Sequence, residues 1–379
     1  MAGEEQQIAV DKLLAAVLRG DAPALPTDAD PAVVVERILY HGIAGLIAEQ
    51  ARGLGDWPSA VIVPLREQAV AQAMWELRHR PLLAGLLDAF ADAGVRALLL
   101  KGSALAYDLY PEASTRSRGD SDVLVASAHV SAARRTLEQR GFVREINGME
   151  AQEEWSIIDQ SGSSHVIDMH WQLLNAPGLS RVMPFAACAQ RPLALARLGA
   201  GAMAMRRTAT LLHTCIHRAV HLTTPYFVDG VTYYGGDRLI WASDIGLLAA
   251  SLSEAEWDEF AAMALDQGVA MVALNGLDFA ARTLGCEVPS RVRKRLAAAT
   301  NESASAYLLS AGQVRRTLAD WRAIPGVGRK LGYAAARLLP PARFMRSKYP
   351  AMAERPLAAL YFRRVIDLFR TRRSQGERR

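Results

Sequence analysis

The stretch LLLKGSALAYDLYPEASTRSRGDSDVLV, residues 98–125, decides the fold of this chain. An apolar run leads into the tripeptide KGS at 101–103, and the pattern then predicts a helix, a polar turn and a second short strand over 120–125. A glycine lets the backbone approach a ligand closely, and the free N–H groups that begin a helix attract anions. This order of elements suits a polyphosphate, although a strand–Gly-Ser–helix turn is also an ordinary connection.

Two aspartates on the second predicted strand point to the same face. Asp120 and Asp122 alternate along the strand, so their side chains lie side by side. Neighbouring carboxylates repel each other unless a cation lies between them, and hard divalent ions take such oxygen ligands. The alternative is the solvated face of an edge strand, but the apolar run VLV that follows is expected to be buried. The pattern favours a site for Mg²⁺ or Mn²⁺.

A third aspartate occurs in a matching context. The segment HVIDMHW, residues 165–171, predicts a strand with Asp168 and His170 on one face. A charged aspartate inside an apolar strand needs a partner. If this strand lies beside 120–125, Asp168 completes a three-carboxylate site that can hold two metal ions for phosphoryl displacement. His170 either contacts that site or packs beside Trp171.

Helical patterns flank this block on both sides. We expect a helical region over 1–93, a small mixed sheet with helices over 94–205, a helical domain over 206–336 and a basic tail over 337–379. The short connections between the later strands favour some antiparallel pairing. The predicted fold class is therefore α+β, a small mixed β-sheet core flanked by N-terminal and C-terminal α-helical regions.

Local signals predict several helix ends. Asp30 before Pro31 is typical of a helix start, and Gly94 is placed to end a long helix. Ser253 with Glu256 matches a capping box.

The composition is that of a globular chain, because 51% of the residues are hydrophobic and 22% are charged. No apolar run reaches the roughly 18 residues that a membrane span requires, and the start MAGEEQQ lacks the pattern of a secretory signal. The three cysteines are far apart and lack CxxC spacing, so neither a disulfide framework nor a cysteine zinc site is expected. We expect a cytoplasmic protein.

The net charge of +5 is unevenly distributed. Residues 337–379 contain twelve Lys and Arg against three Asp and Glu, so the preceding 336 residues carry a net charge of −4. A basic tail of this kind favours an RNA or another acidic partner, although such arginines are most often a solvated surface. The tail is therefore a candidate RNA-binding segment.

The combined pattern resembles a known superfamily. A strand, KGS and a helix, followed by Arg-x₃-Asp-x-Asp-x-Leu-Val and then Asp-x-His-Trp, is similar to the DNA polymerase β-type nucleotidyltransferases. The closer resemblance is to a bacterial branch of uncharacterised nucleotidyltransferases. It covers residues 94–175 well and extends loosely over LLHTCIHRAVH, RLIWASDIGLL and PARFMRSKYP.

This resemblance implies a catalytic metal site and a nucleotide-binding turn. Asp120 and Asp122 would hold the metals, and Asp168 would complete the catalytic site. Gly102 and Ser103 would bind the β- and γ-phosphates of a nucleoside triphosphate such as ATP.

Basic residues complete the implied nucleotide site. The Lys101 ammonium adds a positive charge beside the turn. Arg116 matches the arginine of the branch and would contact phosphate or acceptor, with Arg118 as a substitute in the same turn.

The implied reaction transfers a nucleoside monophosphate from the triphosphate to an acceptor and releases pyrophosphate. The acceptor is a small molecule, a peptide or protein, or an RNA end. The alternative is a non-catalytic nucleotide- or RNA-binding regulatory protein on the same fold, although the presence of all three aspartates disfavours it. A weaker alternative is a kinase-like transfer of the γ-phosphate.

Other polar residues have less specific interpretations. His213, His217 and His221 recur on one helical face, and we expect a packed or hydrogen-bonded stripe rather than a metal site, with His217 lining the cleft. Asp244 lies in an apolar helix and is expected to pair with an arginine.

Three tyrosines lie in the glycine-rich segment TTPYFVDGVTYYGGDR. We expect this segment to be a loop between two helices. Tyr226, Tyr233 and Tyr234 would then cover an acceptor, stack on a base or lie on the surface.

Overall fold

The computed structural model describes most of the chain, in ranges that become short near the C-terminus. These are 2–50, 55, 57–145, 151–222, 225–228, 231–234, 236–310, 312–339, 342, 345–346, 349, 352, 354–364 and 366. The chain forms two compact units, Met1–Gly312 and Gln313–Arg379. The finer division at residues 93, 205 and 336 stays a prediction.

Four helices begin the first unit, as the sequence predicts. They are α1 (Ala2–Leu18), α2 (Pro31–His41), α3 (Ala44–Gln50) and α4 (Ser59–Asp92). The Asp30 side chain accepts a hydrogen bond from Ala32 N at 2.9 Å, which confirms the predicted cap with Pro31 in the first turn. Gly94 has a φ of +68° directly after α4, the left-handed conformation that lets the chain leave the helix.

The centre of the first unit is a mixed sheet of seven strands. They are β1 (Ala97–Leu99), β2 (Asp120–Val125), β3 (Val143–Glu145), β4 (Gln152–Ile158), β5 (Ser164–His170), β6 (Leu193–Ala194) and β7 (Met203–Ala204). Their order is β3-β4-β5-β2-β1-β7-β6. The pairs β3–β4, β4–β5 and β1–β2 are antiparallel, whereas β2 and β5 are parallel. The predicted α+β fold class is confirmed.

Short helices connect these strands. They are α5 (Lys101–Asp108), α6 (Val130–Gln139), α7 (Phe185–Cys188) and the 3₁₀ turns at Ala113–Thr115, Ser127–His129 and Pro177–Leu179. Helix α5 follows β1, so the predicted order of strand and helix is confirmed, but the helix begins at Lys101 and KGS forms its first turn.

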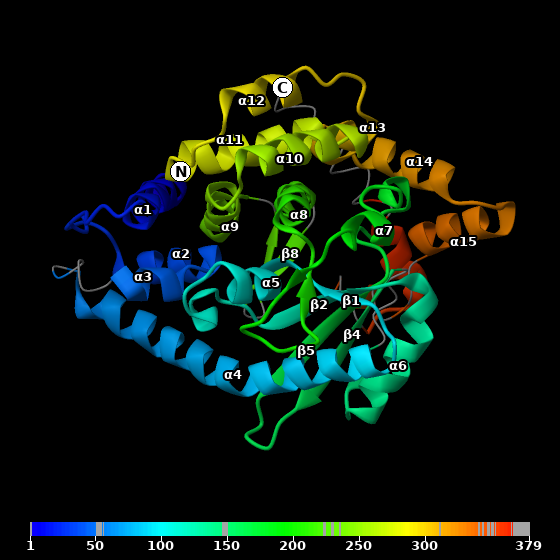
Figure 1. The fold of residues 1–379 in the computed structure, drawn as a ribbon, viewed down its shortest axis with the longest axis horizontal. Coiled ribbons are helices and arrows are strands. Elements are labelled where there is room, and N and C mark those ends of the chain that lie inside the picture. Colours follow the sequence, from blue (N-terminus) through cyan, green and yellow to red (C-terminus); the bar gives the residue numbers. More distant parts are fainter. Residues whose placement is uncertain are drawn as a thin grey trace. The chain divides into compact units, whose positions relative to one another are not determined.

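Alternation along β2 separates an apolar face from the face that holds the aspartates. Val123 and Val125 pack in one core cluster with Leu83 and Leu87 of α4. Leu124 points the other way, into the cluster that contains α8 (Arg207–His221). Figure 1 shows α4 along one side of the strands and α5 and α8 on the other. Asp120 and Asp122 therefore lie on the α8 side of the sheet.

Helices continue the first unit after the sheet. Besides α8 they are α9 (Leu239–Ala250), α10 (Glu254–Asp266), α11 (Ala270–Leu284), α12 (Ser290–Ala297) and α13 (Ser303–Leu309). The predicted capping box is confirmed, because Ser253 N donates to Glu256 Oε2 at 2.8 Å and the Ser253 side chain accepts from Glu256 N. The second unit contains α14 (Gln313–Ala323) and α15 (Val327–Leu338).

The expected loop between α8 and α9 is wrong in one respect. The backbone forms an antiparallel pair there, β8 (Pro225–Val228) with β9 (Val231–Tyr234), in which Tyr226 lies opposite Tyr233. Alternating aromatic and β-branched residues favour strand pairing over an irregular loop. The side chains of Tyr226, Tyr233 and Tyr234 lie outside the described part of the chain, so their roles stay predictions.

Within the described ranges, no single helix has the length and apolar character to cross a membrane. The pair α2 and α3, which are bent by 117° relative to each other, meets the test together by length and composition alone.

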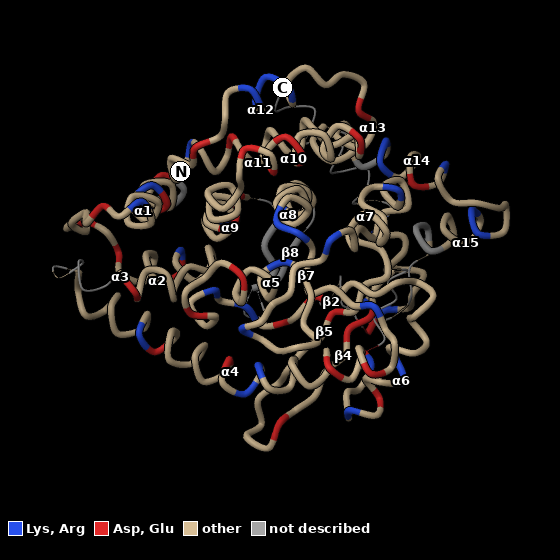
Figure 2. The backbone as a smooth tube through the Cα atoms, in the orientation of Figure 1, with Lys and Arg blue, Asp and Glu red and all other residues tan. Residues whose placement is uncertain are grey.

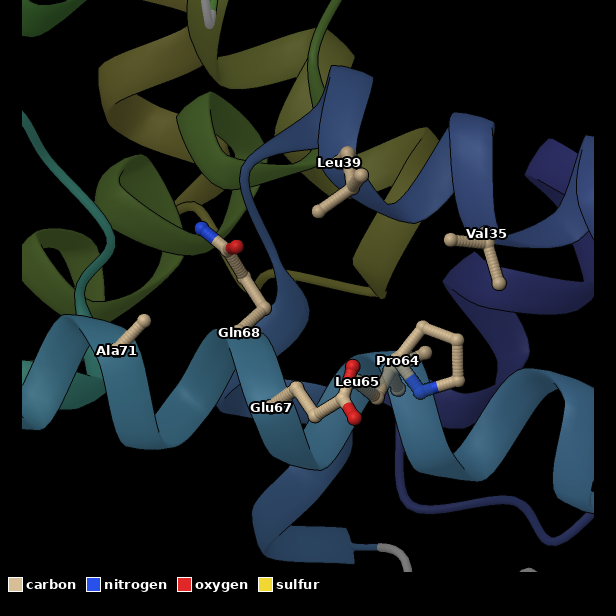
Figure 3. A pocket seen from close by; sticks show the side chains of 7 residues that line it. All are labelled: Val35, Leu39, Pro64, Leu65, Glu67, Gln68 and Ala71. Carbon is tan, nitrogen blue, oxygen red and sulfur yellow. The ribbon is translucent and has the colours of Figure 1, made fainter.

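A hollow of about 340 Å³ lies between α2 and α4. It is lined by Val35, Leu39, Pro64, Leu65, Glu67, Gln68 and Ala71 (Figure 3). None of these residues is one of the predicted site residues, and the hollow is therefore separate from the aspartates of the sheet.

Gly45 in α3 holds the turn before β2 close to the N-terminal helices. A methyl group at Gly45 would lie 2.6 Å from the carbonyl oxygen of Thr115. We expect Gly45→Ala to lower the free energy of unfolding by about 1–3 kcal/mol, because backbone must move. Gly246→Ala in α9 is the matched control, since a methyl group there meets nothing within 4 Å. Urea denaturation of both variants checks the prediction, and equal effects would contradict it.

Candidate functional site

Parallel pairing of β2 and β5 brings two predicted site residues together. Asp122 lies directly opposite Asp168 in the register, and His170 is two residues further along β5. Ligand atoms of Asp122, Asp168 and His170 all lie within 4.8 Å of one another. The expectation that the strand of Asp168 neighbours 120–125 is confirmed. Of the two interpretations of His170, contact with the site is the correct one.

Asp122 is buried and is compensated by two basic groups. Lys101 Nζ donates to Asp122 Oδ1 at 2.5 Å, and His170 Nε2 lies 3.0 Å from the same oxygen. Burial alone raises the pKa of Asp122, but Lys101 and His170 outweigh this effect and lower it below its usual range. The pair of Lys101 and Asp122 thus keeps Asp122 ionised inside the protein.

His170 lies between the two aspartates. Its Nε2 atom is also 3.3 Å from Asp168 Oδ2. Burial lowers the pKa of His170, but the hydrogen bonds to Asp122 and Asp168 outweigh burial and raise it. His170 thus contacts both carboxylates through one ring nitrogen.

Asp120 stands slightly apart from this group. It begins β2 with an exposed side chain and is not among the three residues whose ligand atoms converge. Desolvation by the surrounding protein and the negative charge of Asp122 raise the pKa of Asp120. Asp120 therefore adds negative charge at the edge of the site that faces solvent.

The contacts of the Asp168 carboxylate indicate a cation-binding site. Its Oδ2 accepts a hydrogen bond from Gln152 Nε2 at 3.1 Å, whereas Oδ1 is buried and has no hydrogen-bond partner among the described residues. A buried carboxylate oxygen without a partner is unfavourable unless a ligand satisfies it. Two aspartates and a histidine are donors that fit a divalent cation such as Mn²⁺, and the oxygens alone fit Mg²⁺. The residues present therefore fit a divalent metal.

The resemblance implies that Ser103 binds phosphate, but its hydroxyl contacts β2 in the structure. Ser103 is buried, and its hydroxyl lies 3.2 Å from the carbonyl oxygen of Asp120 and 2.9 Å from Ser121 Oγ. The hydroxyl thus binds β2 in this structure. Lys101 begins α5 with a φ of +48° and directs its ammonium to Asp122. Phosphate binding by Lys101, Gly102 and Ser103 stays a prediction.

Arg116 lies over Gly102 and is occupied by an ion pair. A methyl group at Gly102 would lie 3.2 Å from the Arg116 guanidinium. Arg116 Nε donates to Asp244 Oδ1 at 2.9 Å, and Nη2 donates to Asp244 Oδ2 at 2.7 Å. The expectation that Asp244 pairs with an arginine is confirmed. Arg118 instead pairs with buried Glu76, so both arginines of the turn have protein partners.

The histidines of α8 form the predicted stripe. The rings of His213 and His217 are 6.3 Å apart between centroids, and those of His217 and His221 are 4.4 Å apart. Desolvation lowers the pKa of all three, and the positive charge of Lys101 lowers it further. They are therefore neutral at pH 7 and act as polar packing on the α8 side of the site.

The sequence did not reveal a buried hydrogen-bond chain on the opposite face of β2. His79 Nε2 of α4 lies 2.7 Å from Ser121 Oγ, and His79 Nδ1 lies 3.3 Å from His165 Nδ1. His165 Nε2 in turn lies 3.1 Å from Asp159 Oδ2. One proton direction satisfies every link, with Ser121 donating to His79, His79 to His165 and His165 to Asp159.

The hydrogen bonds from Ser121 through His79 and His165 to Asp159 give Ser121 a structural role. Ser121 faces away from the aspartates and fixes β2 to α4 between Asp120 and Asp122. The sequence offered one sign of this role, because Ser121 shares its face of β2 with Val123 and Val125, which are buried. Such a serine requires a hydrogen-bond partner, but nothing local points to His79.

Burial of His79 predicts a pH-dependent stability. Desolvation lowers the pKa of His79 from 6.5 to about 3, so between these values the unfolded chain binds more protons than the folded chain. The free energy of unfolding therefore falls as the pH decreases below 6.5, by roughly 1.4 kcal/mol per pH unit from this residue. Denaturation of the wild type and His79→Gln between pH 6.5 and 5 measures this contribution. Equal slopes in the two proteins would contradict it.

Neither the curated proteins nor the solved structures gave a match. A family model described as "Uncharacterised nucleotidyltransferase" matches residues 27–285, which include all of the converging site residues and the helices α2 to α11. Because this match covers more than half of the chain, the protein belongs to that family of uncharacterised nucleotidyltransferases.

Proposed function

We propose that this protein is a metal-dependent enzyme that transfers a nucleoside monophosphate from a nucleoside triphosphate to an acceptor and releases pyrophosphate. One observation carries the proposal: Asp122 and Asp168 lie opposite each other on β2 and β5, and Asp168 has an unsatisfied buried oxygen. Membership of the nucleotidyltransferase family supports it. We also infer that the chain belongs to the DNA polymerase β-type superfamily, on the spacing of KGS and the three aspartates.

Asp122 and Asp168 would hold the divalent metal, Mg²⁺ or Mn²⁺, with Asp120 at the solvent-accessible edge of the site. When bound, the metal neutralises phosphate charge and orients the triphosphate. Asp168 Oδ1, which Gln152 leaves without a partner, would bind the metal, and the Asp168 carboxylate would also accept the proton of an acceptor hydroxyl. His170 orients both carboxylates through its Nε2 atom.

The Lys101 ammonium is the basic group nearest to Asp122 and is partly exposed. In the proposed reaction it contacts the triphosphate, which carries more negative charge than the single carboxylate that Lys101 now binds. Arg116 has a different role in this proposal. Its bidentate pair with Asp244 holds the turn against Gly102, so it shapes the nucleotide site through the backbone.

The test separates three reactions by their products. The protein is incubated with a nucleoside triphosphate labelled at the α-phosphate or at the γ-phosphate, with Mg²⁺ or Mn²⁺, and with fractions of small metabolites, peptides and proteins, or RNA. We expect transfer of the α-label to one fraction together with release of pyrophosphate. Transfer of the γ-label with release of nucleoside diphosphate would indicate a kinase instead. Triphosphate binding without metal dependence and without product would indicate a regulatory protein.

A further inference from the structure

The second unit, Gln313–Arg379, has a large excess of positive over negative charge. It contains seventeen Lys and Arg against four Asp and Glu, a net charge of +13. Because the whole chain carries +5, the first unit carries −8. Figure 2 shows basic positions on both α14 and α15. A charge of this size and sign indicates an anionic partner for the second unit.

The same unit exposes large apolar side chains at helical spacing. On α14, Val314, Leu318 and Trp321 are 64%, 43% and 40% exposed, and their spacing of four and three residues places them on one face. On α15, Val327 and Leu331 are 75% and 65% exposed at a spacing of four. We call these five residues the apolar face of the second unit.

Other residues of this unit are packed, so the apolar face is not a sign of an unfolded segment. Asp320 and Ile324 are buried, and Tyr333 of α15 donates to Asp320 Oδ2 at 3.0 Å. This hydrogen bond joins the two helices.

Basic groups surround the apolar face. Lys330 Nζ lies 4.7 Å from the ring centroid of Trp321 and so joins the faces of α14 and α15. Arg315 and Arg322 are exposed next to the apolar residues of α14, and Arg329 is exposed on α15. The surface therefore combines exposed aliphatic groups, an exposed tryptophan and a high density of positive charge.

We propose that the second unit binds peripherally to an anionic lipid surface through α14 and α15. An amphipathic helix with Trp and Leu on one face and Lys and Arg beside them lies in the interface between headgroups and acyl chains. RNA also attracts the positive charge, but it is read by basic and stacking groups and gains nothing from exposed Val and Leu. The aliphatic residues of the apolar face therefore favour lipid over RNA.

The length of the helices fits a position in the plane of the surface. Eleven residues of α14 extend roughly 16 Å, about half of the hydrocarbon thickness of a bilayer. The helix therefore does not span, and its apolar face is buried only to the depth of the headgroup boundary. This proposal is independent of nucleotidyl transfer, because it uses no residue of the sheet.

Flotation of the full-length protein with lipid vesicles tests the proposal. We expect binding to phosphatidylcholine vesicles that contain phosphatidylglycerol, and little binding to pure phosphatidylcholine. Trp321→Ala with Leu331→Ala should weaken binding at least about tenfold, because less apolar surface is buried. Arg322→Glu with Arg329→Glu should do the same, since each basic residue near an anionic surface strengthens binding about fivefold.

Leu77→Ala with Val143→Ala is the control, because these residues are also exposed apolar side chains, at 69% and 64%, but lie in the first unit. Unchanged circular dichroism and thermal unfolding of the full-length protein show that all variants are folded, including those altered in the second unit. Equal binding to charged and neutral vesicles would overturn the proposal, as would equal binding by the Trp321 variant and the control. Retention on labelled RNA without flotation would also overturn it and would assign the basic unit to nucleic acid.

Discussion

Asp122→Asn is expected to reduce nucleotidyl transfer at least about a thousandfold. The amide keeps the shape of the carboxylate but removes the negative charge that Lys101 and His170 contact at 2.5 Å and 3.0 Å. The site then lacks one of the two opposed carboxylates that would hold a divalent cation. Single-turnover transfer of the α-label measures the loss.

The variant also has a readout that does not depend on activity. Binding of Mn²⁺ to the protein, followed by electron paramagnetic resonance, should weaken in Asp122→Asn and in Asp168→Asn. Asp92→Asn is the matched control, because Asp92 is an exposed carboxylate at the end of α4. A variant at Asp122 with unchanged transfer would reject the proposed function, and unchanged Mn²⁺ binding would reject the metal site alone.

Local pattern was sufficient to predict the strands that hold the aspartates. The predicted range 120–125 is also the range of β2, and Asp168 falls in β5 as expected. Alternation along each strand is a property of neighbouring residues, so the shared face of Asp120 and Asp122 follows from the sequence. Whether β5 lies beside β2 does not follow, because pairing depends on how the strands between them fold back. The sequence therefore predicted a site of three aspartates only on the condition that the strand of Asp168 lies beside β2.

The partners of the basic residues were beyond local reasoning. Arg116 was expected to contact phosphate or acceptor, but the structure pairs it with Asp244, 128 positions further along the chain. Both residues carried a signal separately, an arginine in a polar turn and an aspartate in an apolar helix. Their pairing depends on the packing of α9 against the turn before β2, which no motif records. Gly102 was predicted to admit a ligand, and in the structure its missing side chain admits the Arg116 guanidinium.

The buried histidines show the same limit. His170 could be placed on the face of Asp168 from alternation alone, whereas His79 lies on α4, 42 positions before its partner Ser121. A histidine on a long helix has no local feature that distinguishes a buried hydrogen-bond partner from a surface residue. His170 contacts Asp122 on one face of β2, and His79 contacts Ser121 on the other face. Polar contacts therefore fix this strand on both sides. This arrangement gives the aspartates a rigid support.

The ion pair between Arg116 and Asp244 connects this support to the helical region. Only 11% of the Arg116 side chain and 3% of the Asp244 side chain are exposed, and Tyr110 donates a further hydrogen bond to Asp244 Oδ1 at 2.8 Å. Asp244→Ala should therefore lower the free energy of unfolding by about 3–5 kcal/mol, because it leaves the Arg116 charge buried without a partner. Guanidinium denaturation of the purified variant measures this change.

Two further variants show whether the loss comes from the uncompensated charge. Asp258→Ala removes a carboxylate from an exposed pair with Arg291, and we expect a change below about 1 kcal/mol. The double variant Arg116→Met with Asp244→Leu leaves no buried charge, so it should be more stable than Asp244→Ala alone. If the double variant is instead no more stable than Asp244→Ala, the loss does not come from the uncompensated charge of Arg116. If it regains stability, nucleotide binding by the double variant reports whether Arg116 also contacts the ligand.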